Sequence, residues 1–183
     1  LGFSSCQLCN WDISLCTQAM ADRAREALDA FGVTVSSYWA GWSGPKVWNF
    51  TEGPATLGLL PPAYRAQRVA DLKAGGAFAA LLGIRQVATH AGFLPENPQD
   101  PEYPGMIEAL RAVAQDYASR GQYLLFETGQ ETPTTLVRAI GDIGTGNLGV
   151  NLDPANLLMY GKANPVDALD LLGPYVMDVH AKD

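Results

Sequence analysis

The chain contains the apolar run Tyr123-Leu124-Leu125-Phe126-Glu127, which stops at a residue able to bind a metal ion. Two later runs do the same, and they read Leu148-Gly149-Val150-Asn151-Leu152-Asp153 and Tyr175-Val176-Met177-Asp178-Val179-His180. The three runs follow at nearly even intervals, each about the length of one strand plus one helix. Polar residues that end successive parallel strands meet at one rim of a sheet or barrel. We therefore predict that Glu127, Asp153 and His180 lie close together.

Outward from these runs, strands alternate with helices along the whole chain. We predict six strands, at 2–8, 33–39, 84–90, 122–127, 147–153 and 175–180. Predicted helices cover 14–31, 64–82, 105–120, 134–140 and 165–172. Several strands are apolar on both faces, which indicates a parallel sheet of the α/β class. Nothing marks a domain boundary, so we expect residues 1–183 to form a single domain.

Loop lengths indicate which end of the sheet carries the chemistry. The helix-to-strand turns at Gly32, Gly83 and Gly121 are short, whereas the loops at 40–62 and 92–104 that follow strands are long. Long loops after strands place the functional rim at the C-terminal ends of the strands. Both a doubly wound sheet and a (β/α)8 barrel lacking its end units fit this pattern. The chain stops directly after a strand, which favours the incomplete barrel.

Composition excludes some classes of partner. Of the 183 residues, 48% are hydrophobic, which is enough to form the core of a soluble domain. The net charge is −7 and there is no run of basic residues, so we expect no binding to nucleic acid. No segment approaches the roughly 20 apolar residues of a membrane span, so we expect no membrane partner. Cys6, Cys9 and Cys16 lack a second ligand pair for structural zinc. We expect them to be buried and reduced, which favours a cytoplasmic location.

Two carboxylates and one imidazole form the predicted metal site. This set of oxygen and nitrogen ligands suits one divalent ion, Mn²⁺, Mg²⁺, Co²⁺ or Zn²⁺, without choosing among them. Each residue also has a plainer interpretation, in which Glu127 caps a turn, Asp153 opens an Asp-Pro turn and His180 is a hydrogen-bonded core histidine. The shared spacing of all three favours the metal.

Three longer segments carry a resemblance to a known family. They are Phe126-Glu127-Thr128-Gly129-Gln130-Glu131, Asn151-Leu152-Asp153-Pro154-Ala155-Asn156-Leu157 and Asp178-Val179-His180-Ala181-Lys182-Asp183. Together with the opening Leu1-Gly2-Phe3-Ser4-Ser5-Cys6-Gln7-Leu8, they resemble the sugar phosphate isomerase/epimerase family of xylose isomerase-like TIM barrels. The resemblance implies a (β/α)8 barrel that is incomplete in this chain, with strands 2–7 present and strands 1 and 8 missing.

The resemblance also implies an activity. Glu127, Asp153 and His180 would be metal ligands, and a fourth ligand, a glutamate ending strand eight, would lie beyond Asp183. The enzyme would be a metal-dependent isomerase or epimerase of a sugar or sugar phosphate, moving a proton next to a carbonyl through an enediolate, with Glu127 as a base. Loss of hydroxide at the same site would give dehydration, as in inosose dehydratases. The resemblance allows for a chain that is inactive on its own.

Four further residues are predicted to contact a sugar or polyol substrate. His90 ends the third predicted strand, Trp39 ends the second, and Lys182 and Asn156 follow the metal-ligand positions. The plainer interpretations are a structural histidine, loop packing for the tryptophan, and an ion pair of the lysine with Asp178 or Asp183. Asn156 stands where some relatives carry a histidine, which argues against a trinuclear zinc site.

Two other function classes remain open. A non-catalytic barrel that binds a sugar or a protein fits the same fold. An abasic-site endonuclease fits poorly, because it needs more histidines and a basic surface than a chain with two histidines and a charge of −7 provides. Two unpaired strand edges would favour association into a homo-oligomer.

Overall fold

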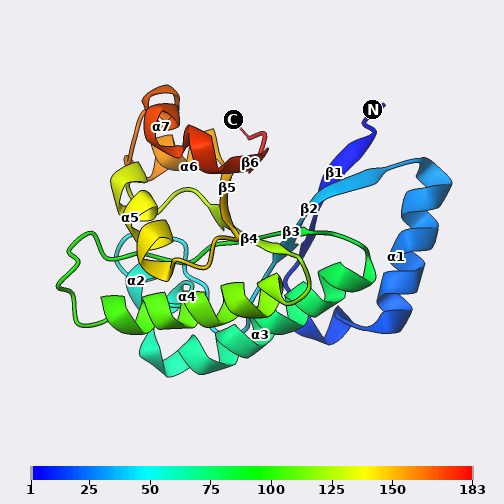
Figure 1. Ribbon diagram of the computed structural model, residues 1–183, viewed down its shortest axis with the longest axis horizontal. Helices are drawn as coiled ribbons and strands as arrows, with labels where there is room; N and C mark the ends of the chain where they lie inside the picture. Colours follow the sequence, from blue (N-terminus) through cyan, green and yellow to red (C-terminus); the bar gives the residue numbers. More distant parts are fainter. Residues whose placement is uncertain (1, 183) are drawn as a thin grey trace.

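A six-stranded parallel sheet organises the protein, whose computed structural model describes residues 2–182 (Figure 1). The strands are β1 (Ser5–Asn10), β2 (Thr34–Ala40), β3 (Gln86–Thr89), β4 (Tyr123–Glu127), β5 (Leu148–Leu152) and β6 (Val176–Val179). Their order in the sheet is their order in the sequence, so each new strand is added on the same side. A doubly wound sheet would reverse direction once. The structure is therefore part of a barrel wall, and the predicted incomplete TIM barrel is confirmed.

Helices connect consecutive strands and cover the outer face of the sheet. They are α1 (Gln18–Phe31), α2 (Gly53–Thr56), α3 (Pro62–Leu81), α4 (Tyr103–Ala118), α5 (Pro133–Ile143), α6 (Pro154–Met159) and α7 (Pro165–Leu172), with 3-10 helices at Ile13–Leu15 and Gly173–Tyr175. Figure 1 shows α3 and α4 lying side by side along the sheet. The core between sheet and helices contains the fully buried Leu72, Leu110, Leu124 and Val150.

Local signals explain where the helices begin and end. The hydroxyl of Thr17 accepts a hydrogen bond from the amide of Met20 at the start of α1, and Gly32 ends that helix with a left-handed φ of 62°. A side chain would be strained there, whereas glycine is not. The predicted glycine turns at Gly83 and Gly121 likewise have positive φ, at 73° and 69°.

A buried arginine holds the long loop that follows β2. Arg68 of α3 has no exposed surface and donates to the carbonyl oxygens of Ser43, Pro45 and Gly58 at 2.6–3.0 Å. Its guanidinium also lies 4.1 Å from the ring centre of Trp42. Burial of a charge is costly unless its donors are satisfied. Arg68 therefore fixes the course of the loop toward the rim of the sheet.

Several predictions about local structure need correction. Two short helices, α2 and α6, lie in segments that were predicted to be loops. Strand β1 begins at Ser5 rather than at residue 2. Cys6 and Cys9 are exposed, so the prediction of buried cysteines is wrong for both, and Cys16 is partly exposed. Both side chains line an open pocket, and within residues 2–182 β1 pairs only with β2. No helix within residues 2–182 is long and apolar enough to cross a bilayer.

Candidate metal centre and pocket

The structure brings the three predicted ligand residues together at the C-terminal rim of the sheet. Glu127 ends β4, Asp153 follows β5 and His180 follows β6. One candidate ligand atom from each lies within 4.8 Å of the other two. His180 Nδ1 is 2.7 Å from Glu127 Oε1 and 3.4 Å from Asp153 Oδ2. The side chains meet because parallel neighbouring strands present their C-terminal ends at one level.

Burial makes this cluster electrostatically unusual. The side chains of Glu127 and Asp153 are 1% and 0% exposed, whereas that of His180 is 42% exposed. Burial raises the pKa of Glu127, although the hydrogen bond to His180 opposes that rise. The same hydrogen bond raises the pKa of His180. Two buried carboxyl groups side by side are costly without a cation. Their donor set fits a divalent ion, which would neutralise both carboxylates.

The two carboxylate oxygens of Asp153 have different roles, one in capping a helix and one in the ligand cluster. Its Oδ1 accepts the amide of Asn156 at 2.8 Å and so caps α6, while Oδ2 faces His180. Lys182 Nζ lies 3.2 Å from the same Oδ2 and 2.5 Å from Asn156 Oδ1. Lys182 therefore pairs with Asp153, whereas the expected partner was Asp178 or Asp183, the latter lying outside the described residues. Asn156 also donates to the carbonyl oxygen of Thr128 at 3.1 Å, so its side chain joins the two strand ends.

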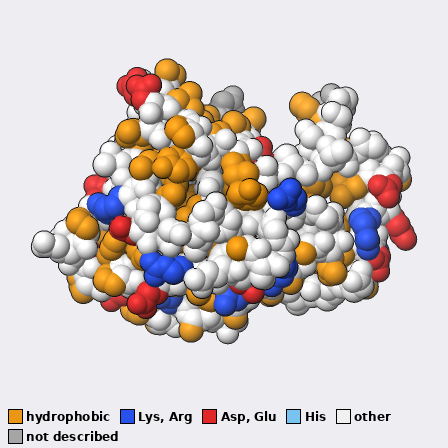
Figure 2. All heavy atoms as spheres, viewed as in Figure 1, with side chains coloured by type: hydrophobic (Ala, Val, Ile, Leu, Met, Phe, Trp, Pro, Cys, Tyr) orange, Lys and Arg blue, Asp and Glu red, His pale blue; other side chains and the backbone are white. Residues whose placement is uncertain are grey.

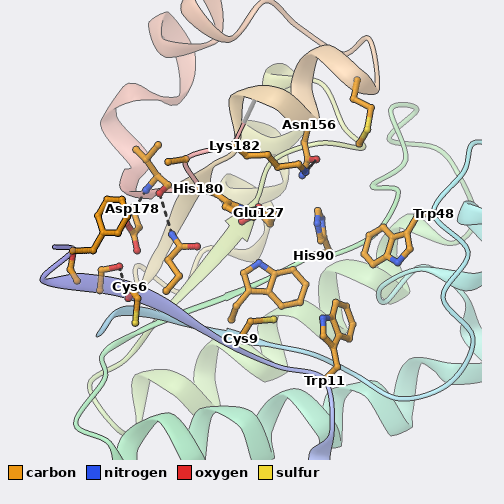
Figure 3. Close-up of a pocket in the computed structure, with 18 of the residues that line it drawn as sticks. Cys6, Cys9, Trp11, Trp48, His90, Glu127, Asn156, Asp178, His180 and Lys182 are labelled. Carbon is orange, nitrogen blue, oxygen red and sulfur yellow. Dashed lines mark hydrogen bonds and ion pairs between the residues drawn. The ribbon is translucent and has the colours of Figure 1, made fainter. Parts of the chain in front are cut away.

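A pocket of about 800 Å³ lies over this cluster. Figure 3 shows Trp11, Trp48 and His90 on one side of the pocket and His180 and Lys182 on the other. In Figure 2 the surface is hollowed between the part that carries β6 and α7 and the part that carries β1. A pocket of this size accommodates a small molecule, and aromatic rings suit the apolar face of a sugar.

His90 belongs to the aromatic side of the pocket rather than to the ligand cluster. Its ring lies 5.3 Å from that of Trp39 and 5.0 Å from that of Trp48. Its Nδ1 is 3.1 Å from Gln130 Oε1. Burial lowers the pKa of His90 to about 3, so the imidazole is neutral near pH 7. A neutral ring among aromatic side chains can hydrogen-bond a hydroxyl group but carries no charge to offer.

Sequence reasoning missed several residues of the site. Trp11 packs against Trp39 at 4.8 Å and follows the end of β1, so the rule used for the ligands also covers it. Trp48 lies within a long loop, and no local pattern marks it. Asn151 lies in the apolar run that ends at Asp153, yet its amide contacts Glu127 and Gln7, which only the folded barrel brings near.

Comparison with known proteins agrees with this geometry. The whole of residues 1–183 matches a family model described as xylose isomerase-like TIM barrel. The chain belongs to this family. Solved structures with this fold include a D-tagatose 3-epimerase-like protein and a D-psicose 3-epimerase, at 19% and 18% identity, where the likeness shows the fold alone. No protein with a curated description matches the chain.

Solved structures show the same fold. A xylose isomerase domain protein from Planctomyces limnophilus superposes with a TM-score of 0.93 at 33% identity, covering 98% of this chain and 64% of that one. The chain thus spans less than two thirds of the length of that relative. A D-tagatose 3-epimerase-like protein has a TM-score of 0.76 at 19% identity, covering 100% of this chain and 68% of that one.

A third structure carries a metal ion. It is a xylose isomerase-like TIM barrel protein from Mycobacterium smegmatis in complex with magnesium, with a TM-score of 0.72 at 20% identity. The match covers 100% of this chain and 62% of that protein. At this identity the likeness shows the fold alone, and the magnesium is a property of the Mycobacterium protein.

Proposed function

We propose that the protein acts as a divalent-metal-dependent isomerase or epimerase of a sugar or sugar phosphate. The observation that carries the proposal is the placement of Glu127, Asp153 and His180, whose ligand atoms lie within 4.8 Å of one another beside the aromatic pocket. The three residues would hold one ion, Mn²⁺, Mg²⁺, Co²⁺ or Zn²⁺. When bound, such an ion stabilises negative charge that develops on neighbouring substrate oxygens.

Glu127 has the properties of a base in proton transfer. Its carboxylate is buried, and burial raises its pKa above that of an ordinary glutamate. A base whose pKa lies nearer the operating pH accepts a proton from carbon more effectively. We propose that Glu127 removes the proton from the carbon next to the substrate carbonyl. Epimerisation then needs a second acid that delivers a proton to the opposite face, the role that the resemblance gives to a glutamate beyond Asp183. Delivery of the proton to the adjacent carbon gives isomerisation instead.

The pocket walls would orient the sugar. Trp39 and the neutral His90 offer an apolar surface with one hydrogen-bonding group. Lys182, held by Asp153 and Asn156, offers a cation at the other side. We propose that His90, Trp39, Lys182 and Asn156 contact the substrate, a small sugar or polyol. The known structures with this fold also include one named a probable 3-DHS dehydratase, and loss of hydroxide instead of proton return is the second candidate reaction.

The experiment is a Glu127→Gln substitution in protein reconstituted with Mn²⁺. Wild type and variant are incubated in deuterated water with ketoses, ketose phosphates and inososes, and products are analysed by NMR. We expect deuterium at the carbon next to the carbonyl for the wild type and at least a hundredfold slower incorporation for Glu127→Gln. The exposed Glu26→Gln serves as a matched control with unchanged turnover. Failure of the wild type to retain any divalent ion after reconstitution would refute the proposal.

A further inference from the structure

We infer that Asn151 is a positioning residue for Glu127, and that Gln7 sets the direction in which Asn151 donates its hydrogen bonds. Asn151 of β5 lies opposite Glu127 of β4 in the register of the sheet, and it has no exposed surface. Its Nδ2 donates a hydrogen bond to Glu127 Oε2. The inference rests on the proposed metal site, because it concerns how Glu127 is presented to the ion.

The direction of each hydrogen bond follows from a backbone carbonyl. Gln7 Nε2 is 3.3 Å from the carbonyl oxygen of Val179, which can only accept, so this end of the Gln7 amide must be the donor. The same Nε2 lies 2.9 Å from Asn151 Oδ1, which therefore accepts. The other end of the Asn151 amide is then its donor, and it faces the Glu127 carboxylate. The carbonyl of Val179 thus fixes two amides in turn.

The contacts are long-range and span the interior of the barrel. Gln7 is on β1 and Asn151 on β5, and 144 positions separate them in the sequence. Asn151 Nδ2 also lies 3.3 Å from Gln7 Oε1, so the two amides form a reciprocal pair. The pair joins the first strand to the strands that carry the ligand residues. Gln7 is only partly buried and lines the pocket, whereas Asn151 is enclosed.

The consequence for Glu127 is that its two oxygens have different roles. Oε2 is held by Asn151, while Oε1 faces His180 Nδ1 at 2.7 Å and points toward the ligand cluster. The carboxylate therefore offers one oxygen to an ion and keeps a fixed plane. Hydrogen bonds to the distant oxygen of a ligating carboxylate orient it, and loss of such a partner typically weakens metal binding 10–100-fold.

The test compares two buried asparagines near opposite ends of the same strand. Asn151→Leu removes the amide beside Glu127, while Asn147→Leu removes one that donates to the carbonyl oxygens of Ala114 and Gln122 at 2.8 and 2.9 Å. Mn²⁺ affinity is measured by calorimetry, the Co²⁺ site by its visible absorption, and fold stability by thermal unfolding of the metal-free protein. We expect Asn151→Leu to weaken Mn²⁺ binding roughly 10–100-fold and to change the Co²⁺ spectrum. Asn147→Leu should lower only the unfolding temperature.

Gln7→Leu gives a second measurement that does not disturb the enclosed position. We expect it to weaken Mn²⁺ binding less than Asn151→Leu does, and the double variant to bind no more weakly than Asn151→Leu alone. Mn²⁺ affinity within twofold of wild type in both single variants would overturn the inference while leaving the metal site intact. A wild-type protein that binds neither Mn²⁺ nor Co²⁺ would overturn the proposed function and this inference together.

Discussion

Glu131 should make the protein less stable as the pH rises, and Glu131→Gln should remove that loss. The residue lies in the segment between β4 and α5 and is 3% exposed. Burial raises its pKa to about 8, although its own backbone amide and the charge of Lys162 oppose the rise. In the unfolded chain a glutamate has a pKa of about 4.3. Folding therefore favours the protonated form of this side chain.

The magnitude follows from the difference between the two pKa values. The stabilising contribution of protonated Glu131 is fully present below about pH 4.3 and is lost as the pH rises toward 8. Between these limits the free energy of unfolding should fall by about 1.4 kcal/mol per pH unit, or roughly 2 kcal/mol between pH 5 and 6.5. A glutamine has nearly the same shape and cannot ionise. The unfolding free energy of the variant should therefore exceed that of the wild type by an amount that grows by about 1.4 kcal/mol per pH unit over this range.

Urea denaturation of metal-free protein at pH 5, 6, 7 and 8 measures the effect. The informative quantity is the difference in unfolding free energy between Glu131→Gln and wild type, because other titrating groups cancel in it. Glu108→Gln makes the same chemical change at an exposed position of α4, where the carboxylate stays in contact with water. Parallel pH curves for Glu131→Gln and wild type would show that Glu131 ionises freely in the folded protein and would refute the reasoning.

Two further predictions concern buried or constrained positions. His90 has a folded pKa of about 3 against about 6.5 unfolded, so its contribution to stability is full above pH 6.5 and is lost as the pH falls toward 3. Below pH 6.5, His90→Gln should remove about 1.4 kcal/mol of destabilisation per pH unit. If urea denaturation showed the same dependence of unfolding free energy on pH in variant and wild type, it would contradict this. Gly58 has φ +62°, and an added Cβ would lie 1.9 Å from the carbonyl oxygen of Ala91. Gly58→Ala should cost roughly 3 kcal/mol or more, whereas Gly161→Ala, with φ +61° but open space, should cost about 1 kcal/mol; equal losses by thermal unfolding would disprove the steric cause.

Local patterns in the sequence predicted most of the fold. The βα period placed all six strands within a few residues of their observed bounds, and α7 begins and ends where it was predicted. Helix α6 was not predicted, although the sequence carries the signal for its start. Asp153 followed by Pro154 is a helix start, with a capping aspartate and a proline at the first helical position, but it was interpreted as a turn.

The exposure of the cysteines on β1 could not be predicted in the same way. Whether a strand lies in the middle or at the edge of a sheet depends on how many partners it has, not on its own residues. Cys6 and Cys9 line the open pocket, and within the described residues β1 pairs with β2 alone. The residues of an apolar segment therefore predict that it forms a strand, but not how many other strands pair with it.

The sequence by itself determined the parallel α/β sheet and the convergence of Glu127, Asp153 and His180, because residues that end consecutive parallel strands must share a rim. The observed strand order then decided for a barrel wall over a doubly wound sheet. That these residues bind a metal stays a prediction. Only the tertiary structure decided what surrounds them. The curvature of the sheet brings Gln7 to Asn151 across 144 positions, and the anchored loop after β2 brings Trp48 to His90. Such contacts depend on register and curvature over the whole sheet, which no short stretch of sequence encodes.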